Sequence, residues 1–376
     1  MSETLTIKNF GPIKDVTLEL RVVNILIGDQ GTGKSTVAKL LSAIKEVSDY
    51  STIQLSVNGK ITSEEQLRSY LNNEFKKQLE VYGIINYLKQ DSYIEFRDSF
   101  DHLKYENQNF TLTTIKKEGE SKHTRLISFI PAYREAIVLL KDDLNAIFAV
   151  GTTLPKIFYY FGQNFSVAKN QKKSYNYTGV LGVEYKYVNN KDTIVLSSGE
   201  EINISEASSA INSGIPLLIV FDNAVESMYD SSHRVYKKLN RPFIVIEEPE
   251  LNCFPSTQNK VMEHFISTIK FKTNNGFDYY SNLVITTHSP YILTSLNNMM
   301  YAYQVGQANG EQAKLIVDEK YWLNPDDVSV FRLTNNGLCE NIMDEELKQI
   351  KVEKIDEISE VLSEQWHELA NLNFQK

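Results

Sequence analysis

Apolar and polar positions along the first ninety residues predict strands followed by helices. The segments "TLTIKNF" and "DVTLELRVVNILIG" alternate, or run apolar, in short bursts rich in β-branched residues, which is typical of strands. The stretch "KSTVAKLLSAIKEVSDY" then repeats its apolar positions at helical spacing. Residues 62–90 also have a helical pattern, with Thr62 or Ser63 as a helix N-cap.

The rest of the chain alternates between the two kinds of element. Residues 135–162 are apolar with a helical pattern, and residues 179–205 predict a meander of strands. The short apolar strands "FIVIEE" and "LVITTH" are each followed by a helix. The tail from about Glu345 is charged and helical in pattern. Strands that alternate with helices in this way predict an α/β fold.

Composition and charge narrow the class of protein. The 376 residues carry a net charge of −9, which argues against a chain-wide basic surface for nucleic acid but leaves a local patch open. The cysteines Cys253 and Cys339 are too few for a disulfide framework and indicate a reducing compartment. No signal-peptide pattern opens the chain, and its apolar runs are far shorter than the ~20 residues of a membrane helix. We therefore expect a cytoplasmic protein that does not enter the membrane.

The segment "GDQGTGKS" fits the phosphate-binding loop pattern G-x-x-x-x-G-K-[ST]. It follows an apolar strand and is followed by a helix, which is the context of a phosphate-binding loop. The alternative is a glycine turn before a helix without a binding role. Its glycines let the backbone N–H groups point at a triphosphate, and the helix N-terminus adds a positive dipole end. We expect Lys34 to reach the β- and γ-phosphates, Ser35 to ligate Mg²⁺ and Thr36 to reach the α-phosphate. The predicted ATP-binding loop comprises Gly28, Asp29, Gln30, Gly31, Thr32, Gly33, Lys34, Ser35 and Thr36.

Two further strand ends carry candidate catalytic groups. A buried strand that ends in Glu247 and Glu248 is poor packing unless cations or water compensate the carboxylates. We expect Glu247 to hold Mg²⁺ and Glu248 to act as the general base for the attacking water, with Glu250 structural. His288, just past the next apolar strand, could contact the γ-phosphate. The alternatives are that the two acids are solvated where the strand leaves the core, and that His288 is a hydrogen-bonded residue at a strand end. We favour function because the ends of these two strands and of the strand before the phosphate loop would meet at one edge of a parallel sheet.

Two serine pairs follow the predicted meander, and either could contact a nucleotide. Residues 197–199 read Ser-Ser-Gly, but two glutamates follow, and their carboxylates would repel a triphosphate. We therefore interpret Gly199 as a hairpin turn. Ser208 and Ser209 come just before a helical pattern, where hydroxyls, N–H groups and the helix dipole favour an anion. The alternative for this second pair is an ordinary helix N-cap.

The order of these motifs resembles a known family. Together with "FIPAYRE", "EASSAINSGIPLL" and "IEEPELNCFP", they resemble the ABC-type ATPase heads of the SMC and RecF group over about residues 1–300. The likeness extends to OLD-family proteins and to ATPase components of anti-phage systems such as Septu and PARIS. It implies a P-loop NTPase head with a mixed sheet core, an antiparallel β subdomain and a helical lobe.

The resemblance also implies how the head works. Two heads would sandwich two ATP molecules in a homodimer or higher oligomer, with Ser208 and Ser209 closing over the partner's γ-phosphate. Arg134 would contact phosphate or the partner, and the alternative is a surface arginine after a proline turn. The chain departs from the family pattern at Ala210 and Asn212, where glycine and glutamine are usual. A left-handed backbone at Ala210 would be strained, and Pro216 would disturb a continuous helix.

These observations leave three functions open. The first is an ATP-hydrolysing switch in bacterial defence that controls a separate effector, a nuclease or a toxin. The others are a scaffold that binds ATP without hydrolysis and a RecF-like DNA-repair ATPase. We divide the chain into a head at residues 1–335, with helical insertions near 62–105 and 135–178, and a helical tail at 336–376. The stretch after residue 300 is also too short for the nuclease domain that the resemblance to OLD-family proteins would imply.

Overall fold

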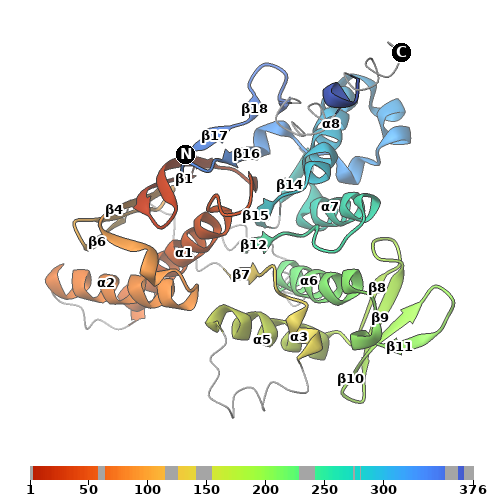
Figure 1. Cartoon of the computed structure of the whole chain (residues 1–376), viewed down its shortest axis with the longest axis horizontal. Helices are drawn as coiled ribbons and strands as arrows, with labels where there is room; N and C mark the ends of the chain where they lie inside the picture. Colours follow the sequence, from red (N-terminus) through yellow and green to blue (C-terminus); the bar gives the residue numbers. More distant parts are fainter. Residues whose placement is uncertain are drawn as a thin grey trace, which may run out of the picture.

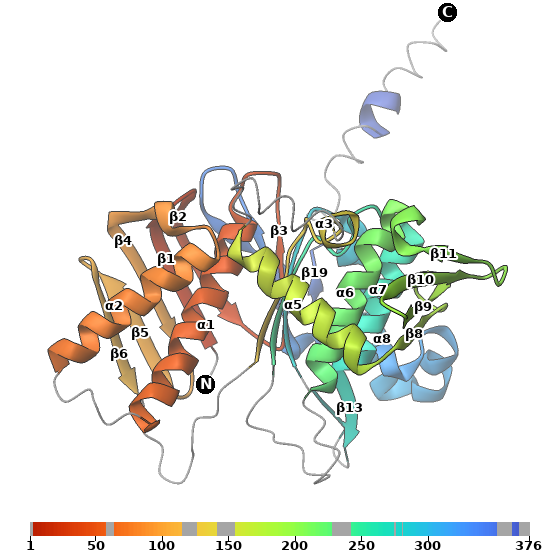
Figure 2. The same ribbon diagram turned by 90° about the horizontal axis from the view of Figure 1, so that it is seen from below.

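The computed structural model describes most of the chain. The described residues are 3–57, 64–114, 126–140, 155–227, 242–273, 276–279, 281–351 and 363–367. Two large sheets are separated by a long helix, and a layer of helices and a small meander lie on the other side of the core sheet (Figures 1 and 2).

The core sheet has six strands in the order β17-β16-β3-β15-β12-β7. The strands β16, β3, β15, β12 and β7 are parallel, and β17 is antiparallel to β16. The carboxyl ends of the parallel strands therefore meet at one edge of the sheet. Their bounds are β3 (Val23–Ile27), β7 (Ile127–Ile130), β12 (Phe243–Glu247), β15 (Asn282–Thr287), β16 (Val328–Leu333) and β17 (Cys339–Asn341).

Alternating side chains of the core sheet enter two different hydrophobic cores. In β3, Val23, Ile25 and Ile27 belong to one core, and Leu26 belongs to the other. Successive side chains of a strand point to opposite faces, so a sheet buried on both faces needs near-continuous apolar strands. This explains why the short, continuous apolar segments of the sequence form the central strands.

The first core lies under four helices, which Figure 2 shows on the side of the core sheet away from α1. They are α5 (Lys156–Gln171), α6 (Ser209–Glu226), α7 (Pro255–Ile269) and α8 (Pro290–Ile316). The short helix α3 (Ala136–Leu139) precedes them in the chain. A four-stranded antiparallel meander packs beside them, as the sequence predicts, and consists of β8 (Ser174–Tyr177), β9 (Val183–Val188), β10 (Lys191–Leu196) and β11 (Glu201–Asn203).

The second core lies between the core sheet and a five-stranded antiparallel sheet, with α1 (Lys34–Val57) in the middle (Figure 2). Val37, Leu41 and Ile44 of α1 pack against apolar side chains of both sheets. The helix that begins at the predicted phosphate loop is thereby fixed on two sides. The outer sheet contains β1 (Glu3–Phe10), β2 (Ile13–Leu20), β4 (Leu88–Arg97), β5 (Asp101–Glu106) and β6 (Asn109–Thr114), and α2 (Glu64–Val81) packs against α1 and β6.

Two predicted helical insertions are partly wrong. In the insertion near residues 62–105, the helix ends at Val81, and β4 and β5 follow as strands of the outer sheet. Their burial alternates along much of each strand, a period that the longer helical pattern before them obscured. In the insertion near 135–178, α3 and α5 are helical, β8 is a strand, and residues 141–154 lie outside the described part.

The predicted helical tail at 336–376 is wrong in its first part. Residues 339–350 form β17 and the small hairpin of β18 (Met343–Asp344) and β19 (Gln349–Ile350). Because β17 pairs with β16, the head does not stop at residue 335. Beyond residue 351 the structure describes only residues 363–367, which are helical.

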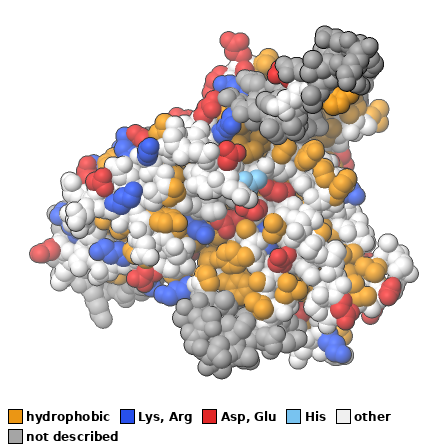
Figure 3. Space-filling view, in the orientation of Figure 1, with side chains coloured by type: hydrophobic (Ala, Val, Ile, Leu, Met, Phe, Trp, Pro, Cys, Tyr) orange, Lys and Arg blue, Asp and Glu red, His pale blue; other side chains and the backbone are white. Residues whose placement is uncertain are grey.

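The surface of the described part carries exposed apolar side chains but shows no membrane-crossing helix. No helix within the described ranges combines the length and the apolar character that a membrane crossing requires. Figure 3 shows hydrophobic side chains gathered over α3 and α5. Leu139, Tyr159 and Tyr160 of these helices are exposed. Apolar exposure of this kind is typical of surfaces that meet another protein.

Candidate active site

Three parallel strands bring the predicted catalytic groups to one edge of the core sheet. The phosphate loop follows β3, the glutamates end β12, and His288 follows β15. The register places Glu247 opposite Thr286, and Thr287 opposite Ile27. Open α/β sheets bind their ligands at this edge. The predicted convergence of these strand ends is confirmed.

The glycines of the loop have backbone conformations that other residues rarely adopt. Gly33 has φ +96°, and a Cβ there would lie 2.6 Å from Ile13 Cδ1. At Gly28 a Cβ would lie 2.3 Å from the carbonyl oxygen of Leu333, the last residue of β16. Glycine is therefore required both by the curl of the loop and by the close approach of a neighbouring strand.

Lys34 lies inside the loop and is held there by backbone carbonyls. Its Nζ donates to the carbonyl oxygens of Gly28 (2.7 Å) and Asp29 (2.8 Å) and lies 3.4 Å from His288 Nδ1. Burial lowers the pKa of Lys34 to about 8, an effect that nearby carboxylates such as Glu248 partly offset. An incoming phosphate would replace neutral acceptors with anionic ones, which form stronger charge-assisted hydrogen bonds.

Glu248 and His288 form the next contact along the site. His288 Nε2 lies 3.4 Å from Glu248 Oε1, and both side chains are about 30% exposed. Since His288 also approaches Lys34, the three side chains form a row across three strand ends. Glu248 has φ +45°, a left-handed backbone that is uncommon for a residue other than glycine.

Glu247 is suited to hold a divalent cation. Its side chain is 3% exposed, and its Oε2 accepts a hydrogen bond from the backbone N–H of Ala132 at 3.3 Å. Its Oε1 is buried and accepts no hydrogen bond from the described residues; Lys39 Nζ lies 3.9 Å away from it. A buried carboxylate oxygen without a partner is costly, and a bound Mg²⁺ or its water would satisfy it. Glu247 therefore fits the Mg²⁺ role proposed for it together with Ser35.

Two supporting contacts were not assigned from the sequence. Glu250 Oε1 accepts hydrogen bonds from the Thr287 hydroxyl and the His288 N–H, both at 2.7 Å, so this acid holds the end of β15. Asn335, in the turn after β16, donates to Asp29 Oδ2 at 3.3 Å. The turn residues "TNNG" at 334–337 were the available signal for a loop, but not for its place beside the phosphate loop.

Arg134 does not lie where a phosphate or a partner could reach it. Its side chain is fully buried, and its guanidinium donates to the backbone carbonyls of Pro131, Ser213, Glu247 and Glu248. Burial lowers its pKa to about 10. The expected direct contact with the nucleotide is therefore wrong, because all of these donors already point into the protein.

The two serine pairs have different surroundings. Gly199, with φ +85°, closes the β10–β11 hairpin, which confirms the predicted turn. Ser208 is the N-cap residue of α6, and its side chain makes no capping hydrogen bond. Ser208 and Ser209 are both exposed at the start of a long helix, so their hydroxyls are accessible. Their predicted contact with a partner's phosphate stays a prediction.

Two sequence-based concerns about this helix do not apply. Ala210 is the second residue of α6 and does not have a positive φ, so its side chain causes no left-handed strain. Pro216 lies inside a helix that continues to Glu226. Its missing N–H leaves one helical hydrogen bond unmade without ending the helix.

We expect Ala210→Gly to leave ATP turnover no faster than in the unchanged protein, because a helical residue 210 does not require glycine. Glycine in a helix costs up to about 1 kcal/mol relative to alanine, so the variant should also melt slightly earlier. Steady-state ATPase assays and thermal melts check both results. A clear gain in turnover would instead indicate that residue 210 leaves the helix when it meets nucleotide.

Comparison with known families is consistent with this geometry. A family model described as the AAA ATPase domain matches residues 1–180 and 71–293, which together cover well over half of the chain. The chain belongs to the AAA ATPase domain family. The expected fold class, an α/β P-loop ATPase head, is thereby confirmed. No curated protein sequence matches this AAA ATPase domain protein.

Several solved structures are distantly similar to this AAA ATPase domain. The SMC head domain from Thermotoga maritima is 13% identical, with 78% of this chain and 91% of that chain covered and a TM-score of 0.35. An Smc head bound to the C-winged helix domain of ScpA is 11% identical, with 92% and 98% covered and a TM-score of 0.42. The recombination mediator protein RecF is 10% identical, with 91% and 98% covered and a TM-score of 0.41. The fold assignment itself rests on the family match and on the sheet topology.

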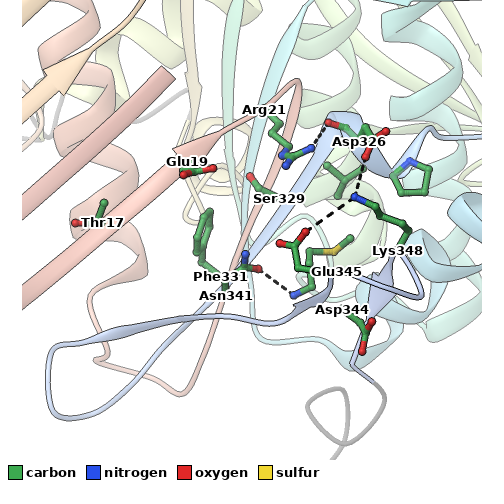
Figure 4. A pocket seen from close by; sticks show the side chains of 13 residues that line it. Thr17, Glu19, Arg21, Asp326, Ser329, Phe331, Asn341, Asp344, Glu345 and Lys348 are labelled. Atoms are coloured by element: carbon green, nitrogen blue, oxygen red, sulfur yellow. Dashed lines mark hydrogen bonds and ion pairs between the residues drawn. The ribbon is translucent and has the colours of Figure 1, made fainter. Parts of the chain in front are cut away.

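A separate hollow of about 250 Å³ lies between the outer sheet and the C-terminal strands. Figure 4 shows Glu19 and Arg21 on one side of it, and Asp326, Glu345 and Lys348 on the other. Asp326 is paired with Lys348 at 3.2 Å. None of the predicted site residues lines this hollow, so it is not part of the candidate active site of the AAA ATPase domain.

Proposed function

We propose that the protein is an ATP-hydrolysing switch that works as a dimer of heads. The observation that carries this proposal is the row of Lys34, His288 and Glu248, which joins the phosphate loop to a candidate base through contacts of 3.4 Å. Membership of the AAA ATPase domain family supports the same substrate.

The residues of the site divide the work of hydrolysis. The loop N–H groups and Lys34 bind the phosphates, and Lys34 exchanges its carbonyl partners for phosphate oxygens. His288 stands between Lys34 and Glu248, where it can donate to a γ-phosphate oxygen. Glu248 accepts a proton from the attacking water and orients it. Mg²⁺, held by Ser35 and Glu247, would neutralise charge on the phosphates.

Exposed aromatic side chains a few positions after the candidate site residues support closure by a second copy. Phe254 lies six residues after Glu248 in the chain, and its side chain is 76% exposed. Tyr291 lies three residues after His288, and its side chain is 51% exposed. Large apolar side chains at a polar site are typical of a surface that is covered during function. The accessible hydroxyls of Ser208 and Ser209, at a helix N-terminus, would supply anion-binding groups to the partner's site.

The test of the dimer is sedimentation of the purified protein with Mg²⁺ and ATP, with ADP, or without nucleotide. We expect dimers only with ATP, and we expect Phe254→Ser to weaken them by about tenfold or more, because it removes an apolar contact at the interface. Leu315→Ser is the matched control, since Leu315 is 88% exposed at the far end of α8. Dimers that form equally well without ATP, or a stronger effect at Leu315, would contradict the proposed interface.

We place this switch in bacterial defence, where it would control a separate effector such as a nuclease or a toxin. The support is the order of motifs, which resembles that of the Septu and PARIS ATPases. A neighbouring gene for a nuclease or toxin, and its co-purification with this protein, would test the assignment. A protein that dimerises with ATP but shows no turnover would instead be a nucleotide-dependent scaffold.

A further inference from the structure

Arg134 joins three separate parts of the chain through backbone carbonyls. It follows β7, and its side chain is 0% exposed. Its Nη1 and Nη2 donate to the carbonyls of Glu247 and Glu248, each at 2.8 Å, and its Nε donates to Ser213 in α6 at 3.2 Å. The rigid fork of an arginine can donate to several carbonyls at once and so hold separate segments in one arrangement.

The contact with Glu248 restrains an uncommon backbone conformation. Glu248 has φ +45°, a conformation that L-residues with a side chain rarely adopt. Its N–H donates to the Thr286 carbonyl at 2.8 Å, and its own carbonyl accepts from Arg134 at 2.8 Å and from the Leu251 N–H at 3.1 Å. Both polar backbone groups of the candidate base are therefore held, the N–H by β15 and the carbonyl by the arginine together with Leu251. Such conformations persist where the surroundings determine them from several sides.

The contact with Ser213 links the same arginine to the helix that carries the serine pair. Ser213 is the fifth residue of α6, one turn after Ser209. The guanidinium therefore lies between the start of α6 and the end of β12, and it bonds to both. A shift of α6 would move a bonded partner of Arg134, and through it the backbone of Glu248.

We propose that Arg134 is a positioning residue that ties the serine-bearing start of α6 to the catalytic geometry of Glu248. This inference rests on the proposed hydrolysis for its kinetic consequence, but the clamp itself is a property of the folded chain. Closure of a partner on Ser208 and Ser209 would then act on the candidate base through Ser213 and Arg134.

Kinetics of two variants test this role. We expect Arg134→Met to lower kcat by about 100-fold and Arg134→Lys by about tenfold, because lysine keeps the charge but cannot span three segments. We expect KM for ATP to stay within about twofold in both, since the phosphate loop is untouched. An equal loss in the two variants, or a change confined to KM, would overturn the positioning role.

The same substitution in a Glu248→Gln background separates positioning from general damage. If Arg134 acts through Glu248, Arg134→Lys should add almost nothing to the loss already caused by Glu248→Gln. Independent, multiplying losses would overturn the proposal. Glu135→Gln is the neighbouring control, because the Glu135 side chain accepts a hydrogen bond from Asn252 at 3.1 Å and not from a proposed catalytic residue, so the variant should leave kcat nearly unchanged.

Hydrogen exchange tests the clamp between α6 and Glu248 even if the unchanged protein does not hydrolyse ATP. Absence of hydrolysis would contradict the proposed function but not the clamp. We expect faster amide exchange in Arg134→Lys at residues 247–253 and at residues 209–217, with β3 unchanged. Faster exchange in only one of these segments, in neither, or throughout the protein would overturn the clamp between α6 and Glu248.

Discussion

Replacement of Glu248 by glutamine is expected to lower ATP turnover by about 10²–10⁴-fold while ATP still binds. Glutamine keeps the size of the side chain and can still occupy the place beside His288, but it cannot accept a proton from water. The phosphate loop does not contain Glu248, so the affinity for ATP should remain. With hydrolysis blocked, the ATP-bound dimer should persist, and sedimentation after addition of ATP should show it for far longer than in the unchanged protein.

The control for this variant is another glutamate outside the site. Glu263 lies on α7 and contacts Asn259, so Glu263→Gln should have normal turnover and short-lived dimers. Steady-state phosphate release and equilibrium binding of a fluorescent ATP analogue give the two quantities. Equal turnover in Glu248→Gln and the unchanged protein would remove Glu248 from the role of general base.

The second large effect concerns the phosphate loop. Lys34→Ala should weaken ATP binding by about 100-fold or more, because it removes the one loop side chain that can form charge-assisted hydrogen bonds to the phosphates. The loss should appear in binding itself, and turnover and dimer formation should fail with it. Isothermal titration with ATP and Mg²⁺ measures the affinity directly.

Folding should survive this change, which makes the result interpretable. Lys34 bonds to the carbonyls of Gly28 and Asp29, which lie at a partly exposed loop where water can replace the ammonium. Lys8→Ala removes a lysine of the same protein that pairs with Asp15 on the outer sheet, and it should bind ATP normally. Tight ATP binding by Lys34→Ala would show that the nucleotide does not use this loop.

The sequence predicted which strand ends would meet at the candidate active site because its signals were local. The spacing of glycines before Lys34, and apolar strands that end in Glu247 or precede His288, each describe a strand and the residues just after it. Parallel strands then bring such ends together without further information. To predict where each of these groups lies, it was therefore enough to recognise a short segment and the direction of its strand.

The role of Arg134 could not be read in the same way. Its partners, Ser213, Glu247 and Glu248, lie about eighty to more than a hundred positions away, and they contribute only main-chain carbonyls, which leave no mark in the sequence.

The prediction of a helical tail was wrong for a related reason. Residues 339–350 contain charged groups that suit a helix, but pairing with β16 and contacts around β18 and β19 decide their conformation.

The neighbours of β3 in the core sheet have a consequence for biosynthesis. β3 ends at Ile27, yet it pairs on one side with β15, from Asn282, and on the other with β16, from Val328. A ribosome must therefore extend the chain past Leu333 before the strand that carries the phosphate loop has both of its partners. Pairings between such distant segments form slowly because a long loop must close first. The nascent protein would gain its capacity to bind ATP only after β16 has been made, so a head that lacks β16 could not start the proposed switch.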